Sequence, residues 1–329
     1  MSDEVLVTGA SGMLGAHVAR RLVAEGYRVR VLLRRERHPM LAGLPLSEHR
    51  GALEDEAMVE DAVRGCRFVF HVAGLVSYRR ADTGALQTAN VLGARHVARA
   101  ALRAGVQRLI HTSSTAALGW SDDPGDLIDE SGIDDRILRQ IPYAWSKRLG
   151  EREVLAAARD GLDAVIVNPA TMYGWGDVKR NTVGALLTLQ RGRLWLVPPG
   201  GMSVIAVEDA VQGHLLALQR GRAGARYVLA SENVAYEEFF RRAAAALRVT
   251  PPRLRLPTAT EPALRAVATV AELVRPGGAL SRGSGVMLYR FRYHDARRAR
   301  SELGWRPTVA LEDAVTEAVR FHTHHPGRA

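Results

Sequence analysis

The sequence has very little lysine and almost no cysteine. Of 45 basic residues in 329 positions only two, Lys147 and Lys179, are lysines. The single cysteine, Cys66, excludes an internal disulfide and fits a reducing compartment, so we expect a cytoplasmic protein. No group of His, Cys and Asp residues has the spacing of a metal site, and we expect no metal.

Long apolar runs are also missing. The best candidate for a membrane segment, residues 262–274, is too short to span a bilayer and is interrupted by Arg265 and Glu272, which leaves a peripheral helix as the alternative. The first residues are acidic and enter a strand at once, so we expect no signal peptide. Apolar residues make up 47% and charged residues 24%, which is the usage of a globular protein of one large domain or two coupled ones.

The net charge of +10 raises the question of a nucleic-acid partner. The arginines are scattered over helical patterns, as at Arg95, Arg99 and Arg103, and do not gather with aromatic residues into a stacking surface. We therefore expect no nucleic-acid partner. A phosphorylated cofactor or an acidic substrate would suit such a surface.

One of the two lysines follows a tyrosine by four residues, in Tyr143-Ala144-Trp145-Ser146-Lys147. On a helix these two side chains lie on one face, one turn apart. A phenol has a pKa of about 10, and a nearby ammonium favours the phenolate and so assists proton transfer. The pair therefore indicates a proton-transfer site, and the alternative is an exposed helix pair without a function.

A glycine-rich turn stands at the N-terminus. The apolar run Glu4 to Thr8 leads directly into Gly9-Ala10-Ser11-Gly12-Met13-Leu14-Gly15, and a helical pattern follows. A strand, a glycine turn and a helix start are the arrangement that places a pyrophosphate on helix N–H groups. The spacing Gly-x-x-Gly-x-x-Gly differs from the commoner Gly-x-Gly-x-x-Gly. It predicts a dinucleotide site, against the alternative of a purely structural turn.

Apolar strand patterns alternate with helical patterns along the first half of the chain. This alternation predicts an α/β fold with a doubly wound parallel Rossmann sheet, whose ligand site lies at the carboxyl ends of the strands. The later part is irregular and is expected to form a smaller C-terminal lobe. Strands are expected at 4–8, 28–33, 67–72, 107–113 and 163–168, and helices near 13–25, 55–64, 90–104 and 142–160.

These motifs together resemble the extended short-chain dehydrogenase/reductase family, that is, the NAD-dependent epimerase/dehydratase family. The resemblance covers nearly the whole chain and is greatest to the dihydroflavonol-reductase-like and 3β-hydroxysteroid-dehydrogenase-like branch. It rests on the glycine turn, the Tyr143 and Lys147 pair and further segments. These are His71-Val72-Ala73-Gly74, Asn90-Val91-Leu92-Gly93, His111-Thr112-Ser113-Ser114, Asn168-Pro169-Ala170-Thr171-Met172-Tyr173-Gly174, 207–214, 224–229 and 302–307.

The resemblance implies a lobe that caps the substrate and a division of the chain into two parts. Residues 1–170 and 203–222 would form the dinucleotide-binding Rossmann domain, and residues 171–202 and 223–329 the substrate-binding lobe. It also implies catalytic roles, in which Ser114 hydrogen-bonds the substrate oxygen, Tyr143 transfers the proton, and Lys147 binds the cofactor ribose and tunes the tyrosine. Ser113 is the alternative serine, because adjacent residues of a strand point to opposite faces. Histidines 71 and 111 stand in buried strand contexts and are expected to be structural.

The cofactor is expected to be NADP, with NAD as the alternative. An acidic residue after the second strand would bind the adenosine ribose and disfavour a 2′-phosphate, whereas this chain has Leu33, Arg34 and Arg35 there. The family often has an aspartate before Leu53, and this chain has Ala52. The residues that the resemblance assigns to cofactor binding are Thr8, Gly9, Ser11, Gly12, Met13, Leu14, Gly15, Arg34, Leu53, Val72, Ala73, Gly74, Tyr143, Lys147, Pro169 and Thr171.

Three classes of function follow. The first is reduction of a ketone or aldehyde, or oxidation of an alcohol, on a small and largely apolar substrate. The second is a nucleotide-sugar epimerase or dehydratase, in which an arginine usually binds the diphosphate where this chain has Met202. The third is a non-catalytic dinucleotide sensor, which the intact Ser114, Tyr143 and Lys147 argue against. We expect the first class, a possible homodimer, and a cap lined by Met172, Trp175, Leu194 and Trp195.

Overall fold

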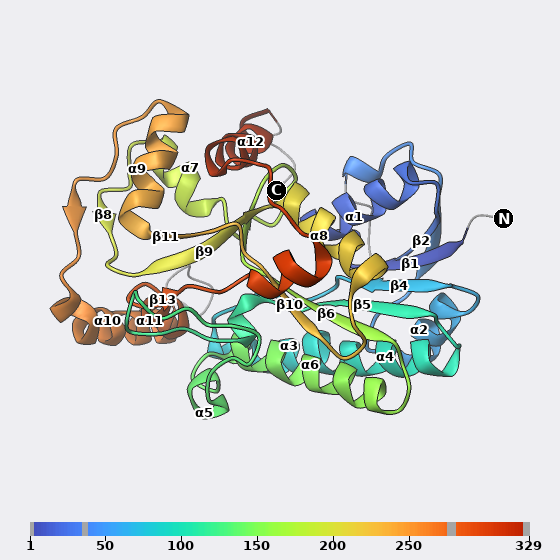
Figure 1. The fold of residues 1–329 in the computed structure, drawn as a ribbon. Coiled ribbons are helices and arrows are strands. Elements are labelled where there is room, and N and C mark those ends of the chain that lie inside the picture. The colour runs from blue at the N-terminus through green and yellow to red at the C-terminus, as the bar shows by residue number, and fades with distance from the viewer. Residues whose placement is uncertain (1–2, 35–38, 275–280, 325–329) are drawn as a thin grey trace.

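Seven parallel strands form the central sheet of the computed structural model, which describes residues 3–34, 39–274 and 281–324 (Figure 1). The strand order is β10-β6-β5-β4-β1-β2-β3. The strands are β1 (Glu4–Thr8), β2 (Arg28–Leu33), β3 (Leu46–Arg50), β4 (Phe68–His71), β5 (Arg108–Thr112), β6 (Ala164–Pro169) and β10 (Arg226–Leu229). The order reverses between β1 and β4, so the predicted doubly wound α/β fold is confirmed.

Helices cover both faces of this sheet. The central strand β1 has Val5, Leu6 and Val7 fully buried, because neighbours lie on either side and helices lie above and below. On one face pack α1 (Met13–Ala24) and α8 (Val207–Arg220), and on the other pack α2 (Glu56–Val63), α4 (Gly93–Arg103) and α6 (Pro142–Arg159) (Figure 1). Pro142 occupies the first turn of α6, where its missing N–H costs nothing, and Asp55 caps α2 by accepting from Met58 N at 3.1 Å.

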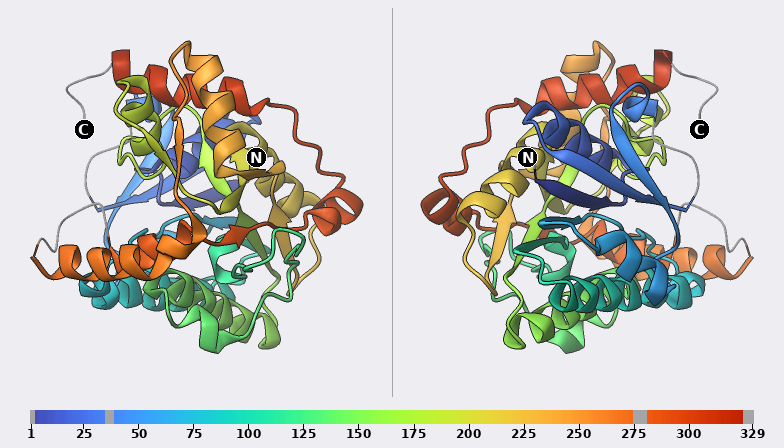
Figure 2. Two further views of the ribbon diagram at one scale, coloured as in Figure 1. Left: turned by 90° about the vertical axis from the view of Figure 1, so that its left-hand side faces the viewer. Right: turned by 90° about the vertical axis from the view of Figure 1, so that its right-hand side faces the viewer.

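A second lobe forms around another sheet. In it β9 (Gly201–Ala206) lies between antiparallel β11 (Glu232–Ala235) and parallel β13 (Phe291–Arg292), and β7 (Thr171–Tyr173) also pairs with β9. Two short strands, β8 (Leu196–Val197) and β12 (Leu254–Arg255), pair separately. The lobe's helices are α7 (Gly184–Gln190), α9 (Tyr236–Leu247) and α12 (Leu311–His324), and its buried cluster includes Phe239 and Phe240. Shorter helices are α3 (Thr83–Leu86), α5 (Asp135–Leu138) and α11 (Arg282–Met287), and α10 (Glu261–Val274) projects at the outer side of the lobe (Figure 2).

The structure corrects the sequence prediction for three strands. It adds β3, which lies at the edge of the main sheet and was not predicted. It also places β9, which crosses the predicted boundary between residues 202 and 203, wholly in the second sheet, and β10, from the range 223–329, in the main sheet, so the predicted division differs from the structure for these two strands. The reason is that strand pairing across long connections is not visible in local sequence. The rest of the division stays a prediction.

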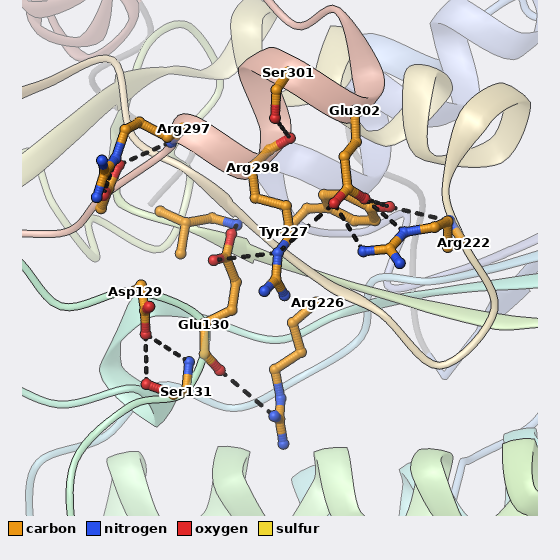
Figure 3. A network of polar contacts seen from close by, with 12 residues as sticks. Asp129, Glu130, Ser131, Arg222, Arg226, Tyr227, Arg297, Arg298, Ser301 and Glu302 are labelled. Carbon is orange, nitrogen blue, oxygen red and sulfur yellow. Dashed lines mark hydrogen bonds and ion pairs between the residues drawn. The ribbon is translucent and has the colours of Figure 1, made fainter.

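Polar contacts protect the edge strand β10 (Figure 3). The buried carboxylate of Glu130 accepts from Val228 N at 3.0 Å, and Tyr227 donates to Glu302 at 2.8 Å. Arg222 also donates to Glu302, at 2.7 and 2.8 Å. Burial raises the pKa of Glu130. These contacts attach both the loop at Glu130 and the C-terminal turn at Glu302 to the sheet, so that the edge N–H of Val228 has a partner.

Candidate active site

The glycine turn between β1 and α1 brings the backbone of two loops very close together. Gly9 has a φ of 75°, and a Cβ at this position would stand 2.5 Å from Ala73 N. A Cβ at Gly15 would stand 2.3 Å from the carbonyl oxygen of Gly9. Only glycine fits at these two places. The turn therefore presents the N-terminus of α1, whose first N–H groups have no partner within the helix, to the adjoining cavity.

Tyr143 and Lys147 lie one turn apart near the start of α6, and both are buried. Lys147 Nζ donates to the carbonyl oxygen of Thr112, at the end of β5, at 2.7 Å. This hydrogen bond fixes the ammonium at the carboxyl end of the sheet. A Cβ at Gly74 would approach Lys147 Nζ to 3.3 Å, so the loop after β4 also passes close to the ammonium.

Burial governs the protonation of this pair. It raises the pKa of Tyr143 above the usual range of a phenol; the neighbouring Tyr78 adds to the rise, and a hydrogen bond with Ser114 opposes it. Burial lowers the pKa of Lys147 to about 8, and the charge of Glu151 opposes that fall. At neutral pH the phenol is therefore protonated and the lysine is mostly charged, the states that a proton donor and its cationic neighbour require.

Ser114 rather than Ser113 is the serine joined to the tyrosine. The Ser114 side chain is linked to Tyr143 by a hydrogen bond and accepts from Ala116 N at 3.1 Å. Ser113 Oγ is buried, and it has no hydrogen-bond partner in the described part of the chain. Both serines line the cavity. The geometry thus favours Ser114 in the role that the sequence assigned to it, although the role itself stays a prediction.

A π-helical turn at 87–92 places Asn90 behind this site. Asn90 Oδ1 accepts from Leu75 N at 2.8 Å, and its amide nitrogen donates to the Leu75 carbonyl and to Ser146 Oγ, each at 2.9 Å. A Cβ at Gly150 would stand 2.3 Å from the Asn90 carbonyl oxygen, so α6 touches this turn directly. Asn90 therefore ties the loop after Gly74 to the helix that carries Tyr143.

One cavity of about 1190 Å³ brings together every residue that the sequence analysis assigned to catalysis or cofactor binding. One end is formed by the glycine turn and the loops after β2 and β4, and the other extends between the main sheet and the lobe. The predicted residues that line it are Thr8, Gly9, Ser11, Gly12, Met13, Leu14, Gly15, Arg34, Leu53, Val72, Ala73, Gly74, Ser114, Tyr143, Lys147, Pro169 and Thr171.

The predicted cap is correct for two side chains and wrong for two. Met172 and Leu194 line the cavity, together with Leu196, Phe239, Phe240 and Leu264. Trp175 instead packs edge-on against Phe321 at 5.0 Å between ring centroids, and Trp195 is 70% exposed. Neighbouring side chains of an extended segment point to opposite sides, and Leu194 and Trp195 lead directly into strand β8, so Leu194 can face the cavity while Trp195 faces away.

The lobe end of the cavity contains a cationic group that was not predicted from the sequence. Arg292, from β13, lines the cavity with Tyr78, Tyr173 and Tyr236, and it donates to the Tyr236 hydroxyl at 2.7 Å. Its Nε has no hydrogen-bond partner within the described chain. This partly buried guanidinium has no carboxylate partner among the described residues, and it can receive a negative or hydrogen-bond-accepting group of a ligand. Because arginine is so common here, sequence gave no signal that set Arg292 apart.

Arg34 lies at the cofactor end with an acidic neighbour. Its side chain is 69% exposed, and its guanidinium stands 3.9 Å from the carboxylate of Glu54, which also lines the cavity. Glu54 was not predicted as a site residue. Arg35 lies outside the described residues. The arginine can therefore reach a phosphate in this part of the cavity, but it must leave a weak ion pair to do so.

Histidines 71 and 111 are buried beneath the site, and neither lines the cavity. Their rings stand 5.1 Å apart, and His71 Nδ1 lies 2.8 Å from Thr8 Oγ1. Burial lowers the pKa of His71 to about 3, and the positive charge of Lys147 adds to the fall. Burial likewise lowers the pKa of His111 well below its usual value. Both imidazoles are therefore neutral, as suits a packing role.

The cavity fits a dinucleotide. A pyrophosphate requires a tight glycine turn and the N–H groups of a helix N-terminus, and the chain has both at the start of α1. The same cavity extends to Lys147, where a nicotinamide ribose would lie. No group of three or more His, Cys, Asp or Glu side chains that could hold a metal occurs among the described residues. None of the described helices has the length and apolar character needed to cross a membrane.

Comparisons with known proteins agree with this geometry. The model of the NAD dependent epimerase/dehydratase family matches residues 5–230. A Synechocystis protein named "Putative dihydroflavonol 4-reductase" is 34% identical over 99% of this chain and 96% of its own length. Sterol demethylase protein B of Methylococcus capsulatus is 33% identical over 94% and 96%. The crystal structure of gox2253 superposes with a TM-score of 0.85 at 34% identity, covering 99% of both chains.

The chain therefore belongs to the NAD dependent epimerase/dehydratase family, the extended short-chain dehydrogenases/reductases. It is an NAD(P)-dependent enzyme of this type, with relatives that carry reductase names. The family resemblance inferred from the sequence motifs is confirmed.

Proposed function

We propose that the protein is an NADP-dependent reductase of ketones or aldehydes on a small, largely apolar substrate, with Tyr143 as the proton donor. The observation that carries the proposal is the joint position of Ser114, Tyr143 and Lys147 in one cavity whose lobe end is lined largely by apolar side chains. Burying apolar substrate surface contributes about 25 cal/mol per Å². Such a pocket discriminates weakly between similar compounds, so several aromatic or alicyclic substrates should be accepted.

In the proposed reaction the bound dinucleotide supplies a hydride to the carbonyl carbon. The carbonyl oxygen accepts a hydrogen bond from Ser114 and takes a proton from the Tyr143 hydroxyl, so that C=O becomes CH–OH. The tyrosine is left as a phenolate. The ammonium of Lys147 on the same helix face stabilises that charge, and the Thr112 carbonyl holds the ammonium in place.

The test is turnover of a defined set of compounds. Purified protein with NADPH is offered aromatic and alicyclic ketones and aldehydes, and separately UDP-glucose, UDP-galactose and GDP-mannose. We expect carbonyl-dependent oxidation of NADPH that the Tyr143→Phe variant lacks. Epimerised or dehydrated sugar nucleotide without carbonyl-dependent NADPH oxidation would reverse the order of the two enzyme classes. Cofactor binding without turnover of either set would favour the dinucleotide sensor.

One observation supports the nucleotide-sugar class as a second candidate. Arg292 offers a cation inside the cavity, and a sugar diphosphate would be a fitting partner for it. Met202, however, occupies the place where related epimerases have a diphosphate-binding arginine, and it is buried in the lining. One cation instead of two weakens the pairing with a diphosphate, which is why we rank this class second.

A further inference from the structure

Among the described residues of helix α10, those with the greatest exposure are all apolar. Val267 and Val270 are 57% and 58% exposed, and Val274 is 80% exposed. The other exposed residues of the helix are Pro262, Ala263 and Ala266, and the side chain of Arg265 is 39% exposed. In a helix that faces water the exposed stripe is polar, so α10 has the reverse pattern.

The charged side chains of α10 are engaged within the protein. Glu261 accepts from Arg290 at 2.8 and 2.9 Å, and Arg265 stands 3.8 Å from the same carboxylate. Glu272 accepts from the backbone N–H groups of Arg80 at 2.7 Å and Arg282 at 3.0 Å. These contacts fix the orientation of α10 about its own axis. In that orientation Val267, Val270 and Val274 face the solvent.

More apolar side chains are exposed at the strand pair β8 and β12, where Trp195 directly precedes β8. Trp195 is 70%, Leu196 47% and Leu254 59% exposed. The chain passes from β12 to α10 through only residues 256–260, and both elements lie on the side that faces the viewer in the left panel of Figure 2. We call Trp195, Leu196, Leu254, Val267, Val270 and Val274 the apolar face. Several exposed apolar side chains on one side of a protein are typical of a binding surface.

The apolar face adjoins the cavity. Leu196 belongs to the face and also lines the cavity, and Leu264 of α10 and Leu256 line it from the same side. The apolar surface therefore continues from the outside of the lobe into the cavity.

The charges around the face favour a negative surface as its partner. Arg191, Arg193 and Arg253 are exposed, stand within a few residues of Trp195 and Leu254, and form no ion pair with the described residues. A second copy of the chain seated on this face would add three more arginines of the same charge to the interface, and like charges repel. A bilayer with anionic lipids attracts them instead, and tryptophan is enriched where a protein meets the lipid headgroups.

We infer that the apolar face docks the protein on the surface of an anionic lipid bilayer, without crossing it. The helix α10 would lie in the plane of the interface with its valines among the upper acyl chains, as interfacial amphipathic helices do. The flanking arginines would pair with lipid phosphates. This inference does not depend on the proposed reaction, because it rests on the outer surface of the lobe.

The test is co-sedimentation of the full chain with vesicles, first of phosphatidylcholine alone and then of phosphatidylcholine mixed with phosphatidylglycerol. We expect binding to the mixed vesicles that weakens as salt is raised. The double variant Val267→Gln/Val270→Gln should lower the partition coefficient roughly tenfold or more, because it removes buried methyl groups from the lipid phase. Leu254→Gln should lower it less.

The matched control is Leu127→Gln, since Leu127 is 57% exposed but lies outside the apolar face. It should leave vesicle binding unchanged. Thermal unfolding followed by circular dichroism checks that each variant is folded, without recourse to activity. Absence of binding to the mixed vesicles, or equal loss in the control and in the valine variant, would overturn the inference. So would a dimer in sedimentation equilibrium that the valine substitutions dissociate, because the occupant would then be a second copy.

Discussion

Glu151 Oε1 accepts a hydrogen bond from Asn168 Nδ2 at 2.7 Å, and the same amide nitrogen donates to the carbonyl oxygen of Ser114 at 3.0 Å. The other carboxylate oxygen of Glu151 accepts from Arg226 Nε at 2.9 Å. Glu151 is fully buried and lies one turn beyond Lys147 on α6. This one carboxylate therefore connects the helix of Tyr143 and Lys147 to the strand end that carries Ser114.

Replacing Glu151 should change the pH dependence of the enzyme. Lys147 acts in its charged form, which is lost as pH rises through a pKa of about 8, and the negative charge of Glu151 raises that pKa. Glu151→Gln removes the charge while retaining an acceptor, so the alkaline fall of kcat/KM should move to lower pH. The same midpoint in wild type and variant would contradict this role. Glu153→Gln, on the same helix but paired with Arg95, is the control and should leave the profile unchanged.

Tyr143→Phe should abolish most turnover and leave cofactor binding intact. Loss of a general acid lowers the rate by about 10²–10⁴-fold. Because the phenol pKa is raised by burial, the wild-type donor stays protonated throughout the neutral range. Turnover and fluorescence titration of NADPH measure the two effects separately. Tyr27→Phe is the control, since Tyr27 packs on Phe68 outside the cavity lining. Retention of more than about a tenth of the turnover would rule out Tyr143 as the donor.

Lys147→Arg should damage both binding and turnover. The ammonium is buried and donates to a single backbone carbonyl, whereas a guanidinium is wider and planar. The titration and the turnover assay should therefore both show a loss. An arginine variant that binds NADPH as tightly as wild type would mean that Lys147 does not contact the cofactor.

The affinity for NADPH relative to NADH should fall when Arg34 is replaced and rise when its neighbour Glu54 is replaced. Arg34→Ala should weaken NADPH binding roughly tenfold. This is the lower end of the effect expected for losing a charged hydrogen-bonded pair, because the Arg34 side chain is largely exposed to solvent. Glu54→Gln should strengthen NADPH binding, since it removes a carboxylate that competes for Arg34 and repels phosphate. Titration of both cofactors into the three proteins decides the matter. Equal affinities of the wild type for the two would remove the preference for NADP.

Local sequence was enough for the interior of the main sheet, because buried parallel strands are continuous apolar runs between helical patterns. It was not enough for β3, whose residues Leu46–Arg50 form an edge strand with mostly exposed, polar side chains. The placement of β10 beside β6 depends on pairing Val228 with Asn168, residues far apart in the chain. Such pairings are decided by packing of the whole fold.

For the candidate site too, the residues in local motifs could be predicted and those placed by long-range packing could not. Gly9, Tyr143 and Lys147 belong to short motifs whose spacing has a direct chemical meaning. Arg292 has no motif, and it enters the cavity only because β13 pairs in parallel with β9, which aligns it with Met202. A cation therefore lies beside Met202, the residue whose identity was the sequence argument against a diphosphate-binding site.

Arg292→Gln should separate charged from uncharged ligands. The guanidinium is held by Tyr236 and has no carboxylate partner among the described residues, so a negative ligand group would gain a charge-assisted hydrogen bond there. We expect the variant to bind UDP, or a ketone bearing a carboxylate, roughly tenfold to a hundredfold more weakly. Reduction of an uncharged ketone should change far less, because such a substrate has no group that needs the cation. Calorimetry and NADPH oxidation measure the two effects. Arg297→Gln, whose side chain is 89% exposed, serves as the control. An equal effect on both kinds of ligand would show that Arg292 supports the shape of the lobe and does not select a charge.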